Sequence, residues 1–417
     1  NGNTNADNGT GLHVVMESEL LDQMNDEMKR AVTPVTIFIG IETFLGFFGN
    51  LFVLYVFIKR YHDCNFRYFV LCLAFLDFIS TLTTMPGEII TQQFWYKYPF
   101  PVVCKVKSFF NVFTVTGEAL CLCIIAVERH RKVCAPFRWQ IRPRQALILC
   151  GVIYCVAFVV SLPAWFLWGS QQDVRLYNGR NVTVTVCGKD SNYENSRQPL
   201  VFGTSLSVLF GQCLIVMLVL YILVARRLIL GRPSAQRRHI SCAPTVSKLS
   251  MSQRKSNQNT EISDESGFTN SDVSTRKGKS TTESSKTESR SLDDESEAVD
   301  KDKVCVTDAE TTCEDGALEV RHKQRIRRRR RDKANIVRRK TYIMFVLTII
   351  FIVTTILYLT LLAFISEEIL KSLNIYEKTV YLFFFRLVFI NHAINPFVYG
   401  CLDPKFKQIL GDIKNMF

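Results

Sequence analysis

Seven long apolar blocks, separated by polar stretches, constrain the fold of this sequence more than any other feature. A helix needs about 20 residues to cross the hydrocarbon core of a bilayer, and an apolar run of that length is typical of a transmembrane helix. Helices buried in soluble proteins are usually shorter and keep one polar face. We therefore predict an all-α membrane protein, a seven-helix bundle whose helices span residues 34–58, 69–92, 102–134, 146–168, 200–230, 341–365 and 380–401.

The blocks divide the chain into regions of different character. They are an N-terminal region (1–32), the first five helices (33–230), a long loop (231–334), the last two helices (335–402) and a short C-terminal amphipathic helix (403–417). The middle of the loop is rich in Ser, Thr and charged residues and almost lacks aromatics, so it cannot bury enough apolar surface to fold. We predict that the loop is disordered and that kinases modify it.

The distribution of basic residues predicts the orientation in the membrane. Lys and Arg gather after the first, third, fifth and seventh blocks, for example at Lys59, Arg131 and Lys405. Such loops face the cytoplasm, which places the N-terminus outside and indicates a multi-pass protein of the plasma membrane. The basic run 325–331 and the net charge of +13 then favour binding to anionic lipids of the inner leaflet, not to nucleic acid.

Glycosylation sequons and cysteines agree with this orientation. The sequons at Asn8 and Asn181 both fall on the predicted outer side, so we expect both asparagines to be glycosylated. Of the 14 cysteines, only Cys104 and Cys187 lie on that side. Because disulfides form in oxidising compartments, we expect these two to be bonded.

The outer loop before the fifth block contains a β-hairpin signal. Residues 174–177 and 181–186 are alternating, β-branched runs that flank Asn178-Gly179. An Asn-Gly pair between such runs is the strongest short-range signal for a hairpin. We predict an extracellular hairpin over the mouth of the bundle, held by Cys187.

Four short motifs occur in order, each in its own block: Gly49-Asn50, Leu73-Ala74-Phe75-Leu76-Asp77, Glu128-Arg129-His130 and Asn395-Pro396-Phe397-Val398-Tyr399. Each motif alone is weakly specific, but the ordered set together with the cysteine pair is highly specific. On these residues the chain resembles the rhodopsin-like (class A) G-protein-coupled receptors, and it looks most similar to neuropeptide receptors. The resemblance covers everything except the N-terminal region and the long loop.

The resemblance implies a site for a heterotrimeric G protein at the cytoplasmic end. Its members are Glu128, Arg129, His130, Phe137, Tyr221 and Tyr399. Arg129 is expected to bind Glu128 in the inactive state and to meet the G protein after the sixth helix moves outward. Phe137 is expected to insert into the G protein, while Tyr221 and Tyr399 support Arg129. Kinases, arrestin and membrane lipids are the further partners that the resemblance implies.

The resemblance also implies a buried polar cluster that can take a sodium ion at Asp77, and no other cofactor. The resemblance supplies Asn50, Asp77, Asn391 and Asn395. Glu118 and His392 are further members that this sequence adds. Glu118 replaces the usual Ser and brings a second carboxylate close to Asp77. Two close carboxylates cannot both ionise cheaply without a cation. The site then either binds sodium more tightly or holds a proton shared with His392, unless Glu118 points elsewhere and bonds a helix carbonyl.

Four polar residues in the outer halves of the helices are candidates for a ligand pocket: Glu42, Glu88, Asn111 and Arg386. A buried Arg386 needs a partner, and both Glu42 and Glu88 lie at a suitable depth; the pair is either structural or in contact with the ligand. Asn111 stands where amine receptors of the family have Asp, which disfavours an amine. The hairpin and the aromatic loops favour a peptide, with a lipid or other small molecule as the alternative.

The sequence departs from the family pattern in the fifth and sixth helices. Thr355 and Leu357 stand where the family has Trp and Pro, and Cys213 stands where the fifth helix has Pro. Without these prolines both helices should be straighter.

Other classes of seven-helix protein find less support. No internal repeat indicates a transporter or channel, and no Lys between residues 380 and 401 could bind retinal. The sequence also contains no nucleophile, metal or phosphate motif that would predict an enzyme. The sequence therefore predicts a receptor for an extracellular ligand, most simply a neuropeptide.

Overall fold

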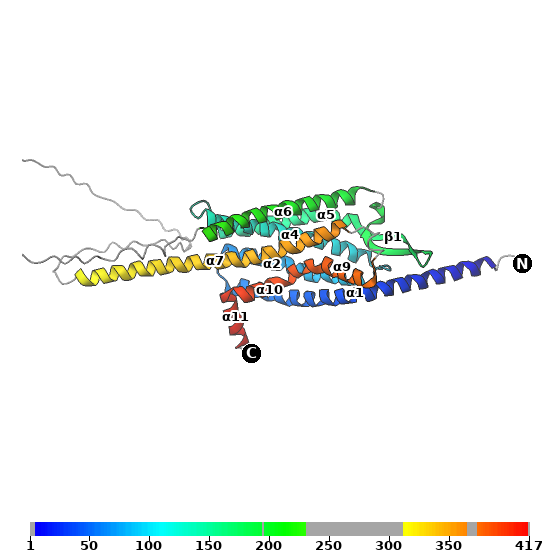
Figure 1. Cartoon of the computed structure of the whole chain (residues 1–417), viewed down its shortest axis with the longest axis horizontal. Coiled ribbons are helices and arrows are strands. Elements are labelled where there is room, and N and C mark those ends of the chain that lie inside the picture. Colours follow the sequence, from blue (N-terminus) through cyan, green and yellow to red (C-terminus); the bar gives the residue numbers. More distant parts are fainter. Residues whose placement is uncertain (1–4, 194–195, 231–311, 365–372, 416–417) are drawn as a thin grey trace, which may run out of the picture. The chain divides into compact units, whose positions relative to one another are not determined.

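The computed structural model describes residues 5–193, 196–230, 312–364 and 373–415 (Figure 1). Seven helical segments in it are long and apolar enough to cross a membrane, which confirms the predicted seven-helix membrane protein. The helices are α1 (Asn5–Arg60), α2 (Asn65–Leu82), α3 (Thr84–Gln93), α4 (Pro101–Cys134), α5 (Pro143–Leu167), α6 (Gln198–Leu230), α7 (Thr312–Phe364), α9 (Ile375–Arg386), α10 (Ile390–Leu402) and α11 (Pro404–Lys414).

Short elements interrupt two of the spans and follow the hairpin. α2 and α3 together form the second span, while α9 and α10 form the seventh and are joined by the 3-10 turn η2 (Leu387–Phe389). A second 3-10 turn, η1 (Ser191–Tyr193), follows the strands. α6 and α7 each run without interruption through the positions of Cys213, Thr355 and Leu357, as the missing prolines predict.

Two predicted boundaries differ from the structure. α7 begins at Thr312, inside the loop predicted to be disordered over 231–334, because its run of Arg, Lys and Ala consists of strong helix formers. α1 begins at Asn5, so most of the N-terminal region 1–32 continues the first helix instead of preceding it. The rest of the loop prediction falls on residues 231–311, which lie outside the described residues.

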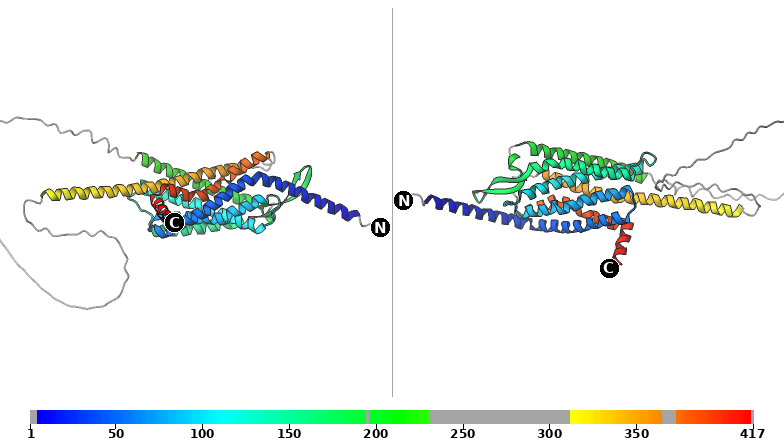
Figure 2. Two further views of the ribbon diagram at one scale, coloured as in Figure 1. Left: turned by 90° about the horizontal axis from the view of Figure 1, so that it is seen from below. Right: turned by 180° about the vertical axis from the view of Figure 1, so that it is seen from behind.

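The helical bundle belongs to one compact unit, Asn1–Arg232 with Gln324–Phe417. Within it the hairpin and α11 lie at opposite ends of the helices, here called the hairpin end and the α11 end (Figure 2). The second unit is Pro233–Lys323, of which the structure describes only the beginning of α7.

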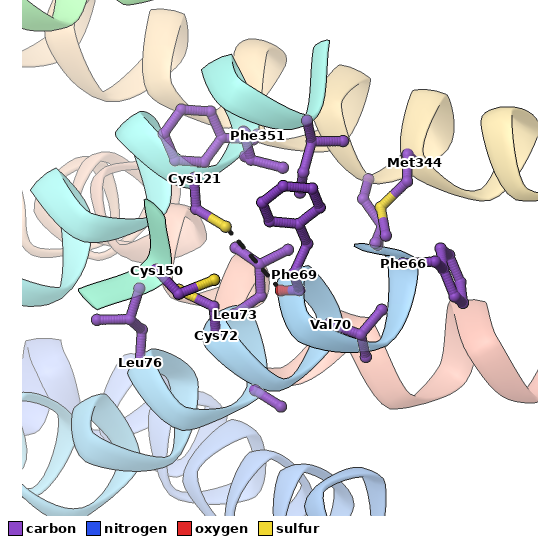
Figure 3. Close-up of a cluster of buried hydrophobic side chains, with 14 of the residues drawn as sticks. Phe66, Phe69, Val70, Cys72, Leu73, Leu76, Cys121, Cys150, Met344 and Phe351 are labelled. Carbon is purple, nitrogen blue, oxygen red and sulfur yellow. Dashed lines mark hydrogen bonds between the residues drawn. The ribbon is translucent and has the colours of Figure 1, made fainter. Parts of the chain in front are cut away.

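α4 packs against α2, α3, α5 and α6 and forms the centre of the bundle. Figure 3 shows Phe69 and Leu73 of α2, Cys121 of α4 and Phe351 of α7 meeting there, all of them buried. The opposite faces of the helices are apolar too: Phe44, Val159 and Ile215 are each more than half exposed. An exterior of this kind is stable in lipid and not in water.

The hairpin consists of β1 (Trp168–Tyr177) and β2 (Arg180–Lys189), paired antiparallel with Tyr177 opposite Arg180. Both turn residues have positive φ, 49° at Asn178 and 78° at Gly179, which is the two-residue turn that an Asn-Gly pair favours. The predicted hairpin is thus confirmed. A disulfide joins Cys104 at the start of α4 to Cys187 in β2, with the Cα atoms 5.6 Å apart.

α1 and α10 approach closely at Gly49 of the Gly-Asn motif. A Cβ built on Gly49 would lie 2.7 Å from Cγ and 3.0 Å from Cβ of Pro396, which is too close for either ring atom. Small residues allow helix backbones to approach in membranes. Gly49 of the Gly-Asn motif and Pro396 of the Asn-Pro-x-x-Tyr motif therefore pack directly against each other.

We expect Gly49→Ala to lower the stability of the bundle by about 1–3 kcal/mol, because the proline ring cannot move away from the added methyl group. The melting temperature of the purified protein in detergent measures this. Gly40→Ala is the matched control in the same helix, since nothing lies within 4 Å of a Cβ there. Equal melting temperatures for both variants would contradict the close packing.

Candidate functional site

Two carboxylates and one imidazole meet in the middle of the bundle. Asp77 of α2, Glu118 of α4 and His392 of α10 are all buried. The Nδ1 atom of His392 lies 3.2 Å from Oδ1 of Asp77 and 2.8 Å from Oε1 of Glu118. Asn395 donates from Nδ2 to the other oxygen of Asp77. The same ring nitrogen therefore lies against both acids, hydrogen-bonded to Asp77 and at ion-pair distance from Glu118.

The remaining asparagines of the predicted cluster contact other groups. Asn50 donates to the backbone oxygen of His392 at 2.7 Å and so holds α10 against α1. The prediction that Asn391 joins Asp77 is not met in its hydrogen bonding, because its amide pairs with Thr354 of α7 at 2.9 Å. Neighbouring positions on a helix differ by about 100° in direction, so Asn391 and His392 face different helices.

A second buried ion pair lies toward the α11 end. Glu128 pairs with Arg129, and Lys132 reaches the same carboxylate at 2.5 Å. Asn65 of α2 donates to Glu128 at 3.3 Å. The side chain of Arg129 is only 2% exposed, so nothing outside the bundle can reach its guanidinium in this conformation.

The two tyrosines predicted to support Arg129 lie in the same half of the bundle, and both are buried. Tyr221 of α6 accepts a hydrogen bond from Thr348 of α7 at 3.1 Å. The Tyr399 ring packs beside Phe406 of α11, with ring centroids 6.4 Å apart, and its hydroxyl has no hydrogen-bond partner among the described residues. No hydrogen bond between either tyrosine and Arg129 occurs in the described part of the chain, so this is a closed arrangement.

The other predicted site residues lie at the two ends. Phe137, in the loop after α4, is fully exposed, and His130 is half-buried near it in sequence. Asn181 is exposed at the start of β2. Asn8 lies in the first turns of α1, but its side chain is outside the described residues.

Three charged side chains meet toward the hairpin end, here called the outer triad: Glu88 of α3, Lys107 of α4 and Arg386 of α9. Arg386 pairs with Oε1 of Glu88. Lys107 Nζ lies 3.2 Å from Oε2 of Glu88 and 2.8 Å from the hydroxyl of Thr91. Arg386 therefore takes Glu88 and not Glu42, whose two buried carboxylate oxygens have no hydrogen-bond partner in the described part of the chain.

Lys107 is the member of the outer triad that the sequence analysis missed. A signal was present, since Lys107 is a charge inside an apolar span and lies one turn before Asn111. Lys105 on the same helix has a different environment. Its Nζ lies 2.9 Å from Asp190 after β2, and this hydrogen bond lowers the pKa of Asp190. Lys105 and Asp190 thus form a separate, neutral pair, in which Asp190 is buried and Lys105 is partly exposed.

Seven apolar helices around buried ion pairs, with a disulfide-linked hairpin at one end, define the class of seven-helix membrane receptors. The sequence model of the 7 transmembrane receptor (rhodopsin family) matches residues 49–399. The chain belongs to this family.

Several curated proteins are similar to this chain. Neuropeptide Y receptor type 4 of Mus musculus is 32% identical over 198 residues, 45% of this chain and 52% of that protein. The pyroglutamylated RF-amide peptide receptor of Mus musculus is 29% identical over 182 residues, 42% of this chain and 41% of that protein. The D(1)-like dopamine receptor of Takifugu rubripes is 26% identical over 171 residues, 39% of this chain and 35% of that protein. The chain spans about half the length of the first of these relatives and less of the others.

We expect His392→Ala to destabilise the bundle by about 3–5 kcal/mol, because it leaves two buried carboxylates without the imidazole that lies against both of them. Adding Glu118→Ala should recover part of this loss, since one carboxylate alone is easier to accommodate. Thermal melting of the purified variants measures both effects.

Asn391→Ala is the matched control, because that side chain neighbours His392 but bonds Thr354. It should cost only about 1 kcal/mol, the value of one neutral hydrogen bond. Strictly additive effects of the His392 and Glu118 changes would show that the two residues do not interact.

Proposed function

We propose that the protein is a receptor activated by an extracellular peptide and that it signals to heterotrimeric G proteins. The observation that carries the proposal is the Glu128–Arg129 pair buried at the α11 end of a rhodopsin-family bundle. Two of the similar proteins are receptors for peptides, which supports a peptide ligand here. Asn111 in place of an acid offers an amine no counter-charge.

We also propose that the hairpin end faces the outside of the cell. The Cys104–Cys187 disulfide requires an oxidising compartment. Exposed arginines such as Arg327, Arg331 and Arg338 on α7 suit the anionic lipids of the cytoplasmic leaflet. The Ser- and Thr-rich composition of residues 231–311 supports kinases, and with them arrestin, as partners.

A receptor of this kind must uncover Arg129 when ligand binds. Contacts of α7 offer a route that needs neither the Trp nor the Pro of the family. The Arg386 guanidinium lies 4.7 Å from the centre of the Phe385 ring, and that ring stacks on Tyr358 of α7 at 4.8 Å. Thr354, one turn away, bonds Asn391 of α10. A ligand that shifts α9 therefore pulls on α7, whose Thr348 would release Tyr221.

The proposal is tested by screening a peptide library on cells that express the full chain, with calcium and cyclic AMP as readouts. An active peptide should lose its signal in Arg129→Ala at equal surface expression, while its binding stays within a few-fold. Lys132→Ala is the control, since it removes the other cation on Glu128 and keeps Arg129. Normal signalling by Arg129→Ala would refute G-protein coupling through this residue, and activation only by lipids or small molecules would refute the peptide ligand.

We further propose that the middle cluster holds one added positive charge, either a sodium ion or a proton on His392. The donor set fits a cation: Asp77 and Glu118 supply carboxylates, and one ligand atom from each of these and from His392 lies within 4.8 Å of the others. Asp77, Glu118 and the oxygen of Asn395 would hold the ion, which supplies a fixed positive charge between two acids.

The two possibilities differ in what stabilises the protein. Sodium should raise the melting temperature over equal potassium if the ion is bound, because a ligand of the folded state stabilises it. Stability should instead fall with rising pH, without a sodium effect, if a proton is held. Glu118→Ser should weaken whichever dependence is present. If Glu118→Ser changes neither the sodium dependence nor the pH dependence of stability, Glu118 is not part of the site.

A further inference from the structure

The outer triad carries more positive charge than negative. One carboxylate, Glu88, faces two cations, Lys107 and Arg386, and all three side chains are largely buried, at 6%, 12% and 16% exposure. Each cation lies against a different oxygen of the carboxylate, Arg386 against Oε1 and Lys107 against Oε2. The sum is one uncompensated positive charge inside the bundle.

The residues around the triad that the structure describes do not balance this charge. Among the residues that the structure describes, Lys107 and Arg386 form ion pairs with Glu88 alone. The nearby acid Asp190 is engaged by Lys105, and the buried carboxylate of Glu42 has no hydrogen bond to either cation. The Nε atom of Arg386 is buried and has no acceptor in the described part of the chain. A buried donor and a buried charge without partners are both costly.

The triad is not completely sealed from the surface of the bundle. It lies at the junction of α3, α4 and α9, toward the hairpin end, and both cations keep some exposure while Glu88 is covered. Tyr358 of α7 stacks beside it on Phe385. The group of the triad that lacks an acceptor among the described residues is thus Nε of Arg386.

We propose that the ligand of this receptor brings an anionic group, a free carboxylate, to Arg386 and Lys107. The inference rests on the proposed receptor function and names the chemistry of its ligand. A guanidinium binds a carboxylate through paired N–H donors, and an ammonium adds a point charge with rotatable donors. A carboxylate restores charge balance and supplies the missing acceptor for Arg386. An amidated peptide end carries no charge and does neither.

The test uses a probe pair and the purified full chain, so it does not depend on finding the natural ligand. N-acetyl-L-phenylalanine has a free carboxylate, and N-acetyl-L-phenylalanine amide has the same shape without the charge. Melting curves against probe concentration give an apparent affinity for each. We expect the acid to bind at least about tenfold more tightly, because hydrogen bonds to charged groups are the stronger ones.

Two variants locate the effect. Lys107→Gln and Arg386→Gln each leave Glu88 with one cation, so both keep a neutral buried pair and should fold. Each should bring the acid and amide affinities to within a few-fold of one another. Lys105→Gln is the matched control, since Lys105 lies on the same helix but pairs with Asp190, and it should keep the preference for the acid.

The outcomes separate this inference from the proposed function. Equal shifts with acid and amide in the unmodified protein, including no shift with either, would overturn the anion site; a deprotonated Lys107 would give this result. A preference that survives in both triad variants would overturn the assignment to Lys107 and Arg386. Failure of the peptide screen with the acid preference intact would overturn the peptide ligand and leave the anion site standing.

Discussion

The hydrocarbon core of a bilayer solvates neither backbone amides nor charges, so every polar group inside this bundle needs a partner within the protein. Three layers of charged side chains meet this demand in part, whereas the buried carboxylate of Glu42 and Nε of Arg386 have no hydrogen-bond partner among the described residues. Glu128 and Arg129 pair toward the α11 end, Asp77, Glu118 and His392 meet in the middle, and the outer triad lies toward the hairpin end. The helices that supply these residues cannot shift freely, since a shift would leave a charge buried alone.

The seventh span connects two of these layers. Arg386 is the last residue of α9 and His392 lies in the first turn of α10, with η2 between them. A 3-10 turn has poorer hydrogen-bond geometry than an α-helix and often marks a hinge. The span therefore yields most easily at the point that separates the outer triad from the middle cluster. Pro396, packed on Gly49, fixes the part of α10 beyond it.

The features that the sequence alone predicted are those set by the length of an apolar run or by a short local motif. Apolar length defined the seven spans, and Asn178-Gly179 defined the hairpin because only its turn needs two positive φ angles. The predicted start of α7 was wrong. The charge and low aromatic content of the preceding loop were interpreted as disorder, although the residues at its end are good helix formers.

Side-chain partners were harder to predict, because they depend on helix rotation. The sequence placed Arg386 at the depth of both Glu42 and Glu88, and only the direction of the helix faces decides for Glu88. The same uncertainty assigned Asn391 to Asp77, although its amide faces Thr354. Lys107 was missed because a single Lys near the end of a span is usually a surface residue whose charge reaches water.

The three layers differ in what they leave unbalanced. Toward the α11 end Glu128 also faces two cations, but Lys132 is 31% exposed and water can solvate its charge. In the middle, two acids lie against one imidazole. This layer therefore carries one net negative charge even when His392 is protonated. The outer triad has one positive charge too many. The imbalances of the middle cluster and of the outer triad have opposite sign, so the two clusters attract one another across η2. An anion that neutralises the outer triad removes this attraction, and the middle cluster then holds its negative charge at a higher cost. Ligand binding would therefore reach the centre of the bundle through the electric field as well as through contacts, without the aromatic residue that the sixth helix lacks.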